Sequence, residues 1–296
     1  MSSLPVARKI TVRLRRVPGT YPVLNALRKR SYSAGIVTVS DFDGTLQMEL
    51  DLSEHMASQI FWFGYYSRDV LFAIERMLRR GDTFVDVGAN IGEVSLFAAK
   101  RVAEMGSVLA FEPMARTAER LRRNLDLNQL HNVDVIEMGL ADRVGERALY
   151  VSTGRFDDGS RHDGLGTMFA NGARSGSAGT VRVTTLDELV SARQIERIDG
   201  IKLDIEGAEL PALSGARDVL TRFKPWLVVE IGKETCAAAG YEPRDIFDFL
   251  AAFGYAGFLI GRKGKLCPVG GETMGVWQNV LLAPQGAKTG EGQSPS

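Results

Sequence analysis

The stretch Asp86-Val87-Gly88-Ala89-Asn90-Ile91-Gly92 decides the fold of this chain of 296 residues. It follows the strand-like run 83–87 and precedes a helical run that begins at Glu93. An acid at the end of a strand, followed by glycines that let the backbone approach a ligand, is typical of the first turn of an open α/β sheet. The dinucleotide fingerprint G-x-G-x-x-G is absent, because Asn90 and Glu93 replace its second and third glycines.

Strand-like and helical runs alternate on the C-terminal side of this turn. Strands are predicted at 83–87, 107–111, 133–138, 148–151, 200–204, 226–231, 257–260 and 276–283, and helices at 93–105, 115–128, 210–222 and 243–253. Such alternation predicts a mostly parallel sheet covered on both faces. Ligands bind such sheets beyond the carboxyl ends of the strands. Residues 154–179 interrupt the pattern with seven glycines, and we expect a long irregular insertion that acts as a mobile lid over a ligand site.

A lead-in precedes the α/β domain. Runs 36–39 and 46–52 flank Asp43-Gly44, a strong hairpin signal. An aromatic run from Phe61 to Tyr66 follows, and Ser67 is the expected N-cap of a helix that stops at Gly81. We expect Phe61 and Phe63 in the core, while Trp62, Tyr65 and Tyr66 either pack in the core or line a ligand pocket.

The two ends of the chain differ from its middle. The first 40 residues carry eight Lys and Arg and no acid, and the alternation over 10–14 predicts a strand. We expect an N-terminal extension that lies on the domain, with organelle targeting as the alternative. The predicted division is therefore a basic extension, hairpin and lead-in helix over 1–80, an α/β domain over 81–283, and a disordered tail over 284–296.

Composition narrows the class of protein. Lys plus Arg and Asp plus Glu both number 36, so no net charge attracts nucleic acid, and we expect no nucleic-acid partner. No apolar run approaches the ~20 residues that a membrane span needs. Cys236 and Cys267 are expected to be free thiols in a reducing compartment, which favours a cytoplasmic location. The oligomeric state is left open.

Acids at the ends of the predicted strands point to a ligand. Glu112, after the second strand, is placed to hold both hydroxyls of a ribose, and together with the Gly88 turn it suggests an adenosine ligand without a pyrophosphate. Asp142 follows the third strand, where it either accepts a hydrogen bond from an adenine amino group or is a solvated turn residue. Asp204 and Glu230 end two later strands, and Glu206 follows the first of these.

These motifs together resemble the FkbM family of S-adenosylmethionine-dependent methyltransferases. The resemblance rests on D-V-G-A-N-I-G at 86–92, F-E-P at 111–113, K-L-D-I-E-G-A-E at 202–209 and V-E at 229–230. It implies a Rossmann-like class I methyltransferase fold, with a seven-stranded, mostly parallel sheet and helices on both faces. It also implies which residues hold S-adenosyl-L-methionine. Glu112 would hold the ribose, Asp142 the adenine, and the methionine portion would be held by Asp86, Gly88, Ala89, Asn90 and Gly92.

The family resemblance implies methyl transfer to a hydroxyl of a sugar, polyketide or other natural product. A hydroxyl must lose its proton, so a general base or a cation is needed. The candidates for the base are Asp204, Glu206, Glu230 and His162. Asp204 and Glu230 would also bind Mg²⁺, which we rank below metal-free action. The alternatives are N- or C-methylation of a small molecule, or an inactive adenosine-binding module that acts through protein contacts.

Overall fold

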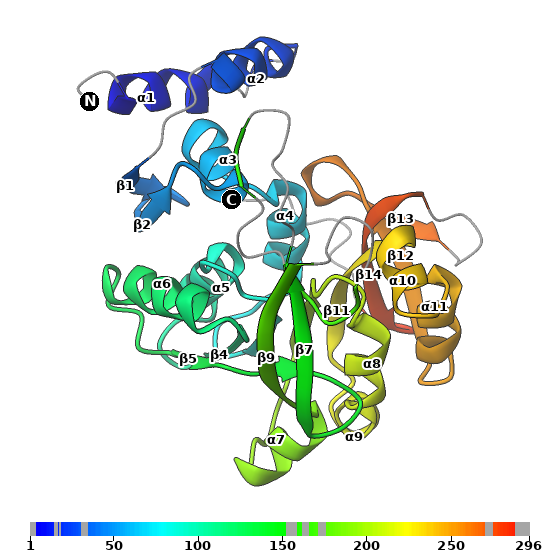
Figure 1. Ribbon diagram of the computed structural model, residues 1–296. Coiled ribbons are helices and arrows are strands. Elements are labelled where there is room, and N and C mark those ends of the chain that lie inside the picture. The colour runs from blue at the N-terminus through cyan, green and yellow to red at the C-terminus, as the bar shows by residue number, and fades with distance from the viewer. Residues whose placement is uncertain are drawn as a thin grey trace.

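A central mixed sheet organises the protein in the computed structural model, which describes residues 4–14, 17, 19–30, 35–151, 159–161, 166–170, 176–269 and 275–287 (Figure 1). Its strand order is β13-β12-β14-β11-β10-β3-β4-β5. The strands are β3 (Thr83–Val87), β4 (Ser107–Phe111), β5 (Val133–Ile136), β10 (Gly200–Leu203), β11 (Trp226–Gly232), β12 (Tyr255–Ile260), β13 (Leu266–Val269) and β14 (Trp277–Pro284).

The sheet has eight strands, so the predicted count of seven is wrong. Strands β5, β4, β3, β10 and β11 are parallel, while β14, β12 and β13 each run antiparallel to their neighbours. The extra strand is β13, which pairs with β12 at the edge of the sheet. The run that forms β13 contains Pro268 and shows no clear alternation of apolar and polar residues. Both features make an edge strand difficult to predict from a sequence.

The strand order reverses between β3 and β10, which is the switch point of the sheet. Three neighbouring strands end level there, because Val87 pairs with Phe111 on one side and with Leu203 on the other. The residues that follow these strands therefore meet at one edge. This register brings together segments that lie far apart in the sequence.

Helices cover both faces of the sheet. On one face α4 (Arg68–Met77) and α5 (Glu93–Val102) pack on a core that includes Phe84 and Val108, and on the other α7 (Leu186–Ala192), α8 (Glu209–Ser214), α9 (Arg217–Arg222) and α11 (Pro243–Ala251) pack on a core that includes Val85. Neighbouring residues in a strand point to opposite faces, and Phe84 and Val85 show this alternation. The predicted helix 210–222 is two helices, with a break at Gly215.

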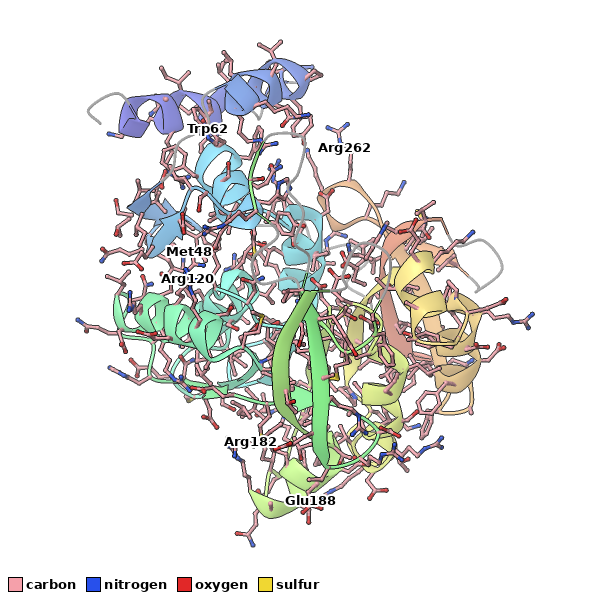
Figure 2. All side chains as sticks on the ribbon, in the orientation of Figure 1. Met48, Trp62, Arg120, Arg182, Glu188 and Arg262 are labelled. Carbon is pink, nitrogen blue, oxygen red and sulfur yellow. The ribbon has the colours of Figure 1, made fainter. Side chains whose placement is uncertain are left out.

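The lead-in forms a hairpin and a helix against α6 (Ala115–Asp126). Strands β1 (Ile36–Phe42) and β2 (Leu46–Asp51) pair antiparallel as predicted. Helix α3 (His55–Phe63) follows and buries Phe61, Trp62 and Phe63. Arg120, labelled in Figure 2, extends from α6. It forms an ion pair with Glu54, just before α3. Ser67 precedes α4, but its side chain makes no cap hydrogen bond, and the helix ends at Met77 rather than Gly81.

The N-terminal segment is helical, so the predicted strand over 10–14 is wrong. Helices α1 (Leu4–Leu14) and α2 (Tyr21–Arg30) form a layer outside α3 (Figure 1). Arg8 and Thr11 are one helical turn apart and both are buried. The Arg8 guanidinium donates to the carbonyls of Ile60 and Phe61 at the end of α3, and forms an ion pair with Asp41. Because they are three residues apart, Arg8 and Thr11 lie on the same face of a helix, whereas in a strand they would point to opposite faces.

A second sheet lies beside the first, with order β6-β9-β7-β8. It consists of β6 (Gly139–Leu140), β7 (Gly145–Val151), β8 (Gly166–Thr167) and β9 (Gly176–Thr184). The predicted irregular insertion over 154–179 is therefore wrong where β8 and the start of β9 form. The rest of that insertion is described only at 159–161 and 168–170, and the predicted tail only at 284–287. Among the described residues, no helix is long and apolar enough to span a membrane.

Candidate functional site

A pocket of about 440 Å³ opens at the carboxyl edge of the sheet, where β3, β4, β10 and β11 end. Its wall also includes residues of the lead-in and of the second sheet, among them His55, Tyr66 and Met168. Seven of the predicted site residues lie in this wall: Gly88, Ala89, Asn90, Glu112, Asp204, Glu206 and Glu230. One register of parallel strands thus gathers them as the strand-end argument expects.

The turn after β3 is held tightly against its neighbours. The N–H groups of Gly88 and Ala89 both donate to the carbonyl of Phe111, at 3.0 and 2.9 Å. Gly88 has φ +80°, and a Cβ there would lie 2.1 Å from the carbonyl oxygen of Asp204. Only glycine therefore fits at position 88, both for its backbone angle and for its contact with the next strand end.

Glu112 follows β4 and is buried in the pocket wall. Its carboxylate accepts hydrogen bonds from the backbone N–H groups of Asn90 and Met114, each at 3.0 Å. Burial raises the pKa of Glu112 to about 7, against the opposing effect of these two hydrogen bonds. The carboxylate is thus fixed in orientation and keeps lone pairs for hydroxyl donors in the pocket.

Asp86 lies beneath the turn and outside the pocket wall. Its side chain is fully buried, Ser95 Oγ donates to Oδ2 at 2.6 Å, and Lys202 Nζ lies 3.7 Å from Oδ1. Gly92 is also outside the wall. It packs closely against the helices instead, because a Cβ there would meet the side chains of Leu96 and Leu121. Both residues shape the turn from below rather than reach into the pocket.

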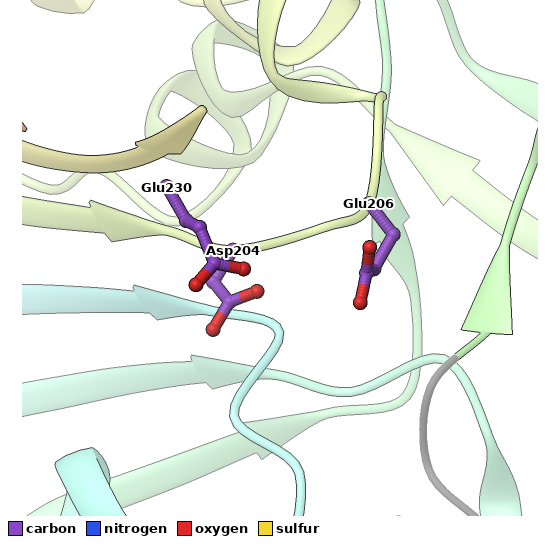
Figure 3. A group of neighbouring side chains, drawn as sticks. All are labelled: Asp204, Glu206 and Glu230. Carbon is purple, nitrogen blue, oxygen red and sulfur yellow. The ribbon is translucent and has the colours of Figure 1, made fainter. Parts of the chain in front are cut away.

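Three carboxyl groups converge at the other side of the pocket. Oxygens of Asp204, Glu206 and Glu230 lie within 4.8 Å of one another (Figure 3). Lys202 Nζ lies 3.3 Å from Asp204 Oδ2 and donates to the Gly88 carbonyl at 3.2 Å. Burial, then the neighbouring Asp204, raises the pKa of Glu230 to about 10. This direction favours the neutral form of the Glu230 carboxyl group beside Asp204.

The loop that carries Asp204 and Glu206 is fixed by Glu209. The buried Glu209 carboxylate accepts from the N–H groups of Ile205 and Gly207, both at 3.0 Å, and from the Tyr241 hydroxyl at 3.1 Å. Glu206 itself has φ +56°, an unusual angle for a residue with a side chain. Glu209 thus has a structural role, and it turns the loop so that Glu206 faces the pocket.

Glu93, at the start of α5, is a wall residue that the sequence reasoning missed. Its buried carboxylate accepts from the backbone N–H groups of Tyr66 and Ser67, at 2.5 and 3.0 Å. Burial raises its pKa to about 7. Tyr66 is thereby held in the wall, where its ring meets that of His55 edge-on at 6.1 Å. The signal for Glu93 in the sequence was its position at the start of a helix. The helix dipole alone favours an acid there, so this position did not point to a role in a ligand site.

Lys202, His55 and Trp277 are further wall residues that sequence reasoning missed. For Lys202 the signal was a charge inside an otherwise apolar strand, since Ile201 and Leu203 flank it. Asp142 lies outside the wall, where it is exposed and forms an ion pair with Arg147 at 3.3 Å. His162 lies outside the described residues.

The comparison with protein families agrees with this geometry. A sequence model of the family described as "Methyltransferase FkbM domain" matches residues 86–256. The chain belongs to this family. It therefore carries an S-adenosylmethionine-dependent methyltransferase domain, and the matched residues include the turn after β3, Glu112 and the three convergent carboxyl groups.

Curated relatives of this FkbM domain differ in size. The chain is 27% identical over 236 residues to the AMB antimetabolite synthetase AmbE of Pseudomonas aeruginosa, which covers 70% of this chain and 11% of AmbE. It is 27% identical to the hexuronic acid methyltransferase AglP of Haloferax volcanii, over 62% of this chain and 67% of AglP. It is 26% identical to the 2-O-methyltransferase NoeI of Sinorhizobium fredii, over 61% of this chain and 76% of NoeI.

Proposed function

We propose that this FkbM domain transfers the methyl group of S-adenosyl-L-methionine to a hydroxyl of a small molecule, sugar or natural product. The observation that carries the proposal is the placement of three convergent carboxyl groups in the wall of the same pocket that holds the Gly88 turn and Glu112. A hydroxyl acceptor needs a proton acceptor close by, and Asp204 with its two neighbours supplies one.

The residues around the turn fit S-adenosyl-L-methionine. Gly88 leaves room that a Cβ would fill, and the buried Glu112 carboxylate is suited to two ribose hydroxyls. The turn residues Ala89 and Asn90 would hold the methionine portion, with Asp86 and Gly92 supporting them from below. For the adenine we propose the apolar part of the wall near Met138 and Leu140, because Asp142 is turned to solvent. The bound molecule supplies an activated methyl group.

Asp204 is the base that we propose. S-adenosyl-L-methionine held in the pocket would supply the methyl group to the acceptor oxygen, and Asp204 would take the proton of that hydroxyl. The Lys202 ammonium, 3.3 Å away, stabilises the Asp204 carboxylate. The raised pKa of Glu230 favours its neutral form, which would lower the repulsion within the cluster. Glu206 then faces the acceptor as a hydrogen-bond acceptor for a further hydroxyl.

A divalent cation is the alternative way to ionise the hydroxyl. Sequence reasoning named two carboxylate ligands, and the structure adds Glu206 as a third. Oxygen ligands of this kind suit Mg²⁺. We nevertheless propose metal-free action, because Lys202 already places an ammonium against Asp204 and would repel a second cation.

Two relatives bear on the acceptor. The printed name of NoeI specifies a 2-O-methyltransferase and that of AglP a hexuronic acid methyltransferase. On this basis we propose a sugar hydroxyl as the first acceptor class to test. N- and C-methylation remain alternatives without a feature of the pocket in their favour.

The test is incubation with methyl-labelled S-adenosyl-L-methionine and pools of neutral sugars, uronic acids and polyketides. We expect a labelled product whose new methyl resonance is that of a methyl ether. A labelled N-methyl or C-methyl product would contradict O-methylation. Cofactor binding without a product from any pool, under conditions where a known methyltransferase reacts, would favour the adenosine-binding module.

A further inference from the structure

Large apolar side chains are exposed on the two N-terminal helices. On α1 these are Ile10 and Leu14, with exposed fractions of 52% and 41%, and on α2 they are Val23 and Leu27, with 63% and 47%. Within each pair the residues are four apart, so they share one face of their helix. Each helix thus presents an aliphatic stripe to solvent.

The inner faces of the same helices are fixed to the rest of the protein. On α1, Arg8 is buried and donates to the Ile60 carbonyl at 2.8 Å. On α2, Leu24 is buried in the same core cluster as Met48 and Trp62. At about 100° per residue, Ile10 lies about 200° from the buried Arg8 around α1, and Val23 lies about 100° from the buried Leu24 around α2. The two stripes are therefore turned away from the faces that contact the rest of the protein. The aliphatic side chains are exposed because residues on the other face of each helix make the contacts with the rest of the protein.

Basic side chains accompany the aliphatic stripes. Lys9 and Arg13 lie beside Ile10 and Leu14 on α1, and Lys29 is exposed on α2. None of these three forms an ion pair with a carboxylate among the residues that the structure describes. The first acid in the sequence is Asp41, so no negative charge in either helix offsets them.

We propose that the outer faces of α1 and α2 dock on an anionic lipid surface. Aliphatic side chains beside Lys and Arg on a helix face suit the boundary between head groups and acyl chains, where both kinds of group find partners. The two helices form the outermost layer at one end of the molecule (Figure 1), so a flat surface can approach them. A second copy of this chain would instead bring like charges together.

The test uses the full-length chain and vesicles of phosphatidylcholine alone or with phosphatidylserine. Phosphatidylserine should raise the bound fraction by at least about tenfold at low salt, because several basic side chains contribute, and added salt should reverse this gain. Binding that is equal on both vesicle types, or absent, would overturn the proposal.

Two variants and a matched control separate the contributions. Ile10→Asn with Leu14→Asn removes one aliphatic stripe, and Lys9→Glu with Arg13→Glu reverses the neighbouring charge. Each should abolish the gain on anionic vesicles while the circular dichroism spectrum and S-adenosyl-L-methionine affinity stay unchanged. Met105→Asn with Val144→Asn alters exposed apolar residues elsewhere and should bind as the unmodified protein does.

The variants also identify the competing occupants of this surface. Sedimentation that shows a concentration-dependent dimer, lost in Ile10→Asn with Leu14→Asn, would overturn the lipid proposal in favour of self-association. Vesicle binding that survives both variants would place the lipid contact on another surface and would equally overturn it. Methyl transfer to a soluble acceptor is a separate readout, so failure here leaves the proposed reaction untouched.

Discussion

Lys202 and Asp204 are two residues apart at the end of β10, and their charged groups meet with Nζ 3.3 Å from Oδ2. The same ammonium lies 3.7 Å from the buried Asp86 and donates to the carbonyl of Gly88. One buried cation therefore serves both the turn proposed to hold the cofactor and the carboxyl groups proposed to act on the acceptor. Losing it would leave the Asp86 carboxylate buried without a countercharge.

The first prediction concerns the stability that Lys202 provides. Lys202→Met should lower the free energy of unfolding by about 3 to 5 kcal/mol, the usual cost of breaking a buried ion pair from one side. Chemical denaturation measures this change. Lys265→Met, at an exposed position, should change it by less than about 0.5 kcal/mol. Adding Asp86→Asn to Lys202→Met should recover part of the loss, and strictly additive effects would show that the two charges do not interact.

The second prediction concerns the close approach at Gly88. Gly88 and Gly81 have similar φ angles, +80° and +84°, but a Cβ at Gly81 meets nothing within 4 Å. Gly81→Ala should therefore cost only the backbone strain, about 1 to 2 kcal/mol. Gly88→Ala should cost more and should abolish cofactor binding, because the Cβ displaces the Asp204 carbonyl. Denaturation and calorimetry measure the two effects, and equal costs for the two variants would refute the close contact.

The third prediction is a pH dependence of cofactor affinity. Burial raises the pKa of Glu112 to about 7, so the group is protonated below that pH and ionised above it. Two ribose hydroxyls donate better to the ionised form. Affinity should therefore rise with pH, by up to about tenfold per unit below pH 7, and level off above it. Isothermal titration calorimetry measures this.

Glu112→Gln is the control for that pH profile. It should weaken binding at pH 8 by about 1.5 to 3 kcal/mol, the scale of a charge-assisted hydrogen bond, and should flatten the profile. Burial also raises the pKa of Glu93 and of Glu209 to about 7. A profile that persists in Glu112→Gln would assign the titration to one of these two and would remove the ribose role from Glu112.

The fourth prediction separates the base from the cation. Asp204→Asn should keep most of the cofactor affinity and lower the transfer rate by at least ~10². EDTA should leave the rate of the unmodified protein unchanged. Asp142→Asn, at an exposed carboxylate outside the pocket, should transfer at the original rate. Loss of activity with EDTA, restored by Mg²⁺ and reproduced by Glu230→Gln, would replace the metal-free mechanism with a metal-assisted one.

The sequence predicted the carboxyl edge of the sheet better than its surroundings. Strand ends such as Val87 and Phe111 were predictable because apolar runs stop at a polar residue or glycine, and level strand ends bring those residues together. The contribution of Lys202 was not predictable, because it depends on Asp86 and Gly88, which are distant in sequence. A local alternation over 10–14 predicted a strand, whereas the tertiary contact of Arg8 with α3 favours a helix.

The contact between Gly88 and the Asp204 carbonyl also limits how the acceptor range of this domain can be redesigned. A change in the backbone that carries Asp204 would move the turn proposed to hold the methyl donor, so we expect changes in selectivity made from that side to reduce turnover as well. The pocket wall also includes His55 and Met56 of α3, and Met168, which follows β8. Libraries aimed at new acceptors should therefore vary these three positions and leave the strand ends alone.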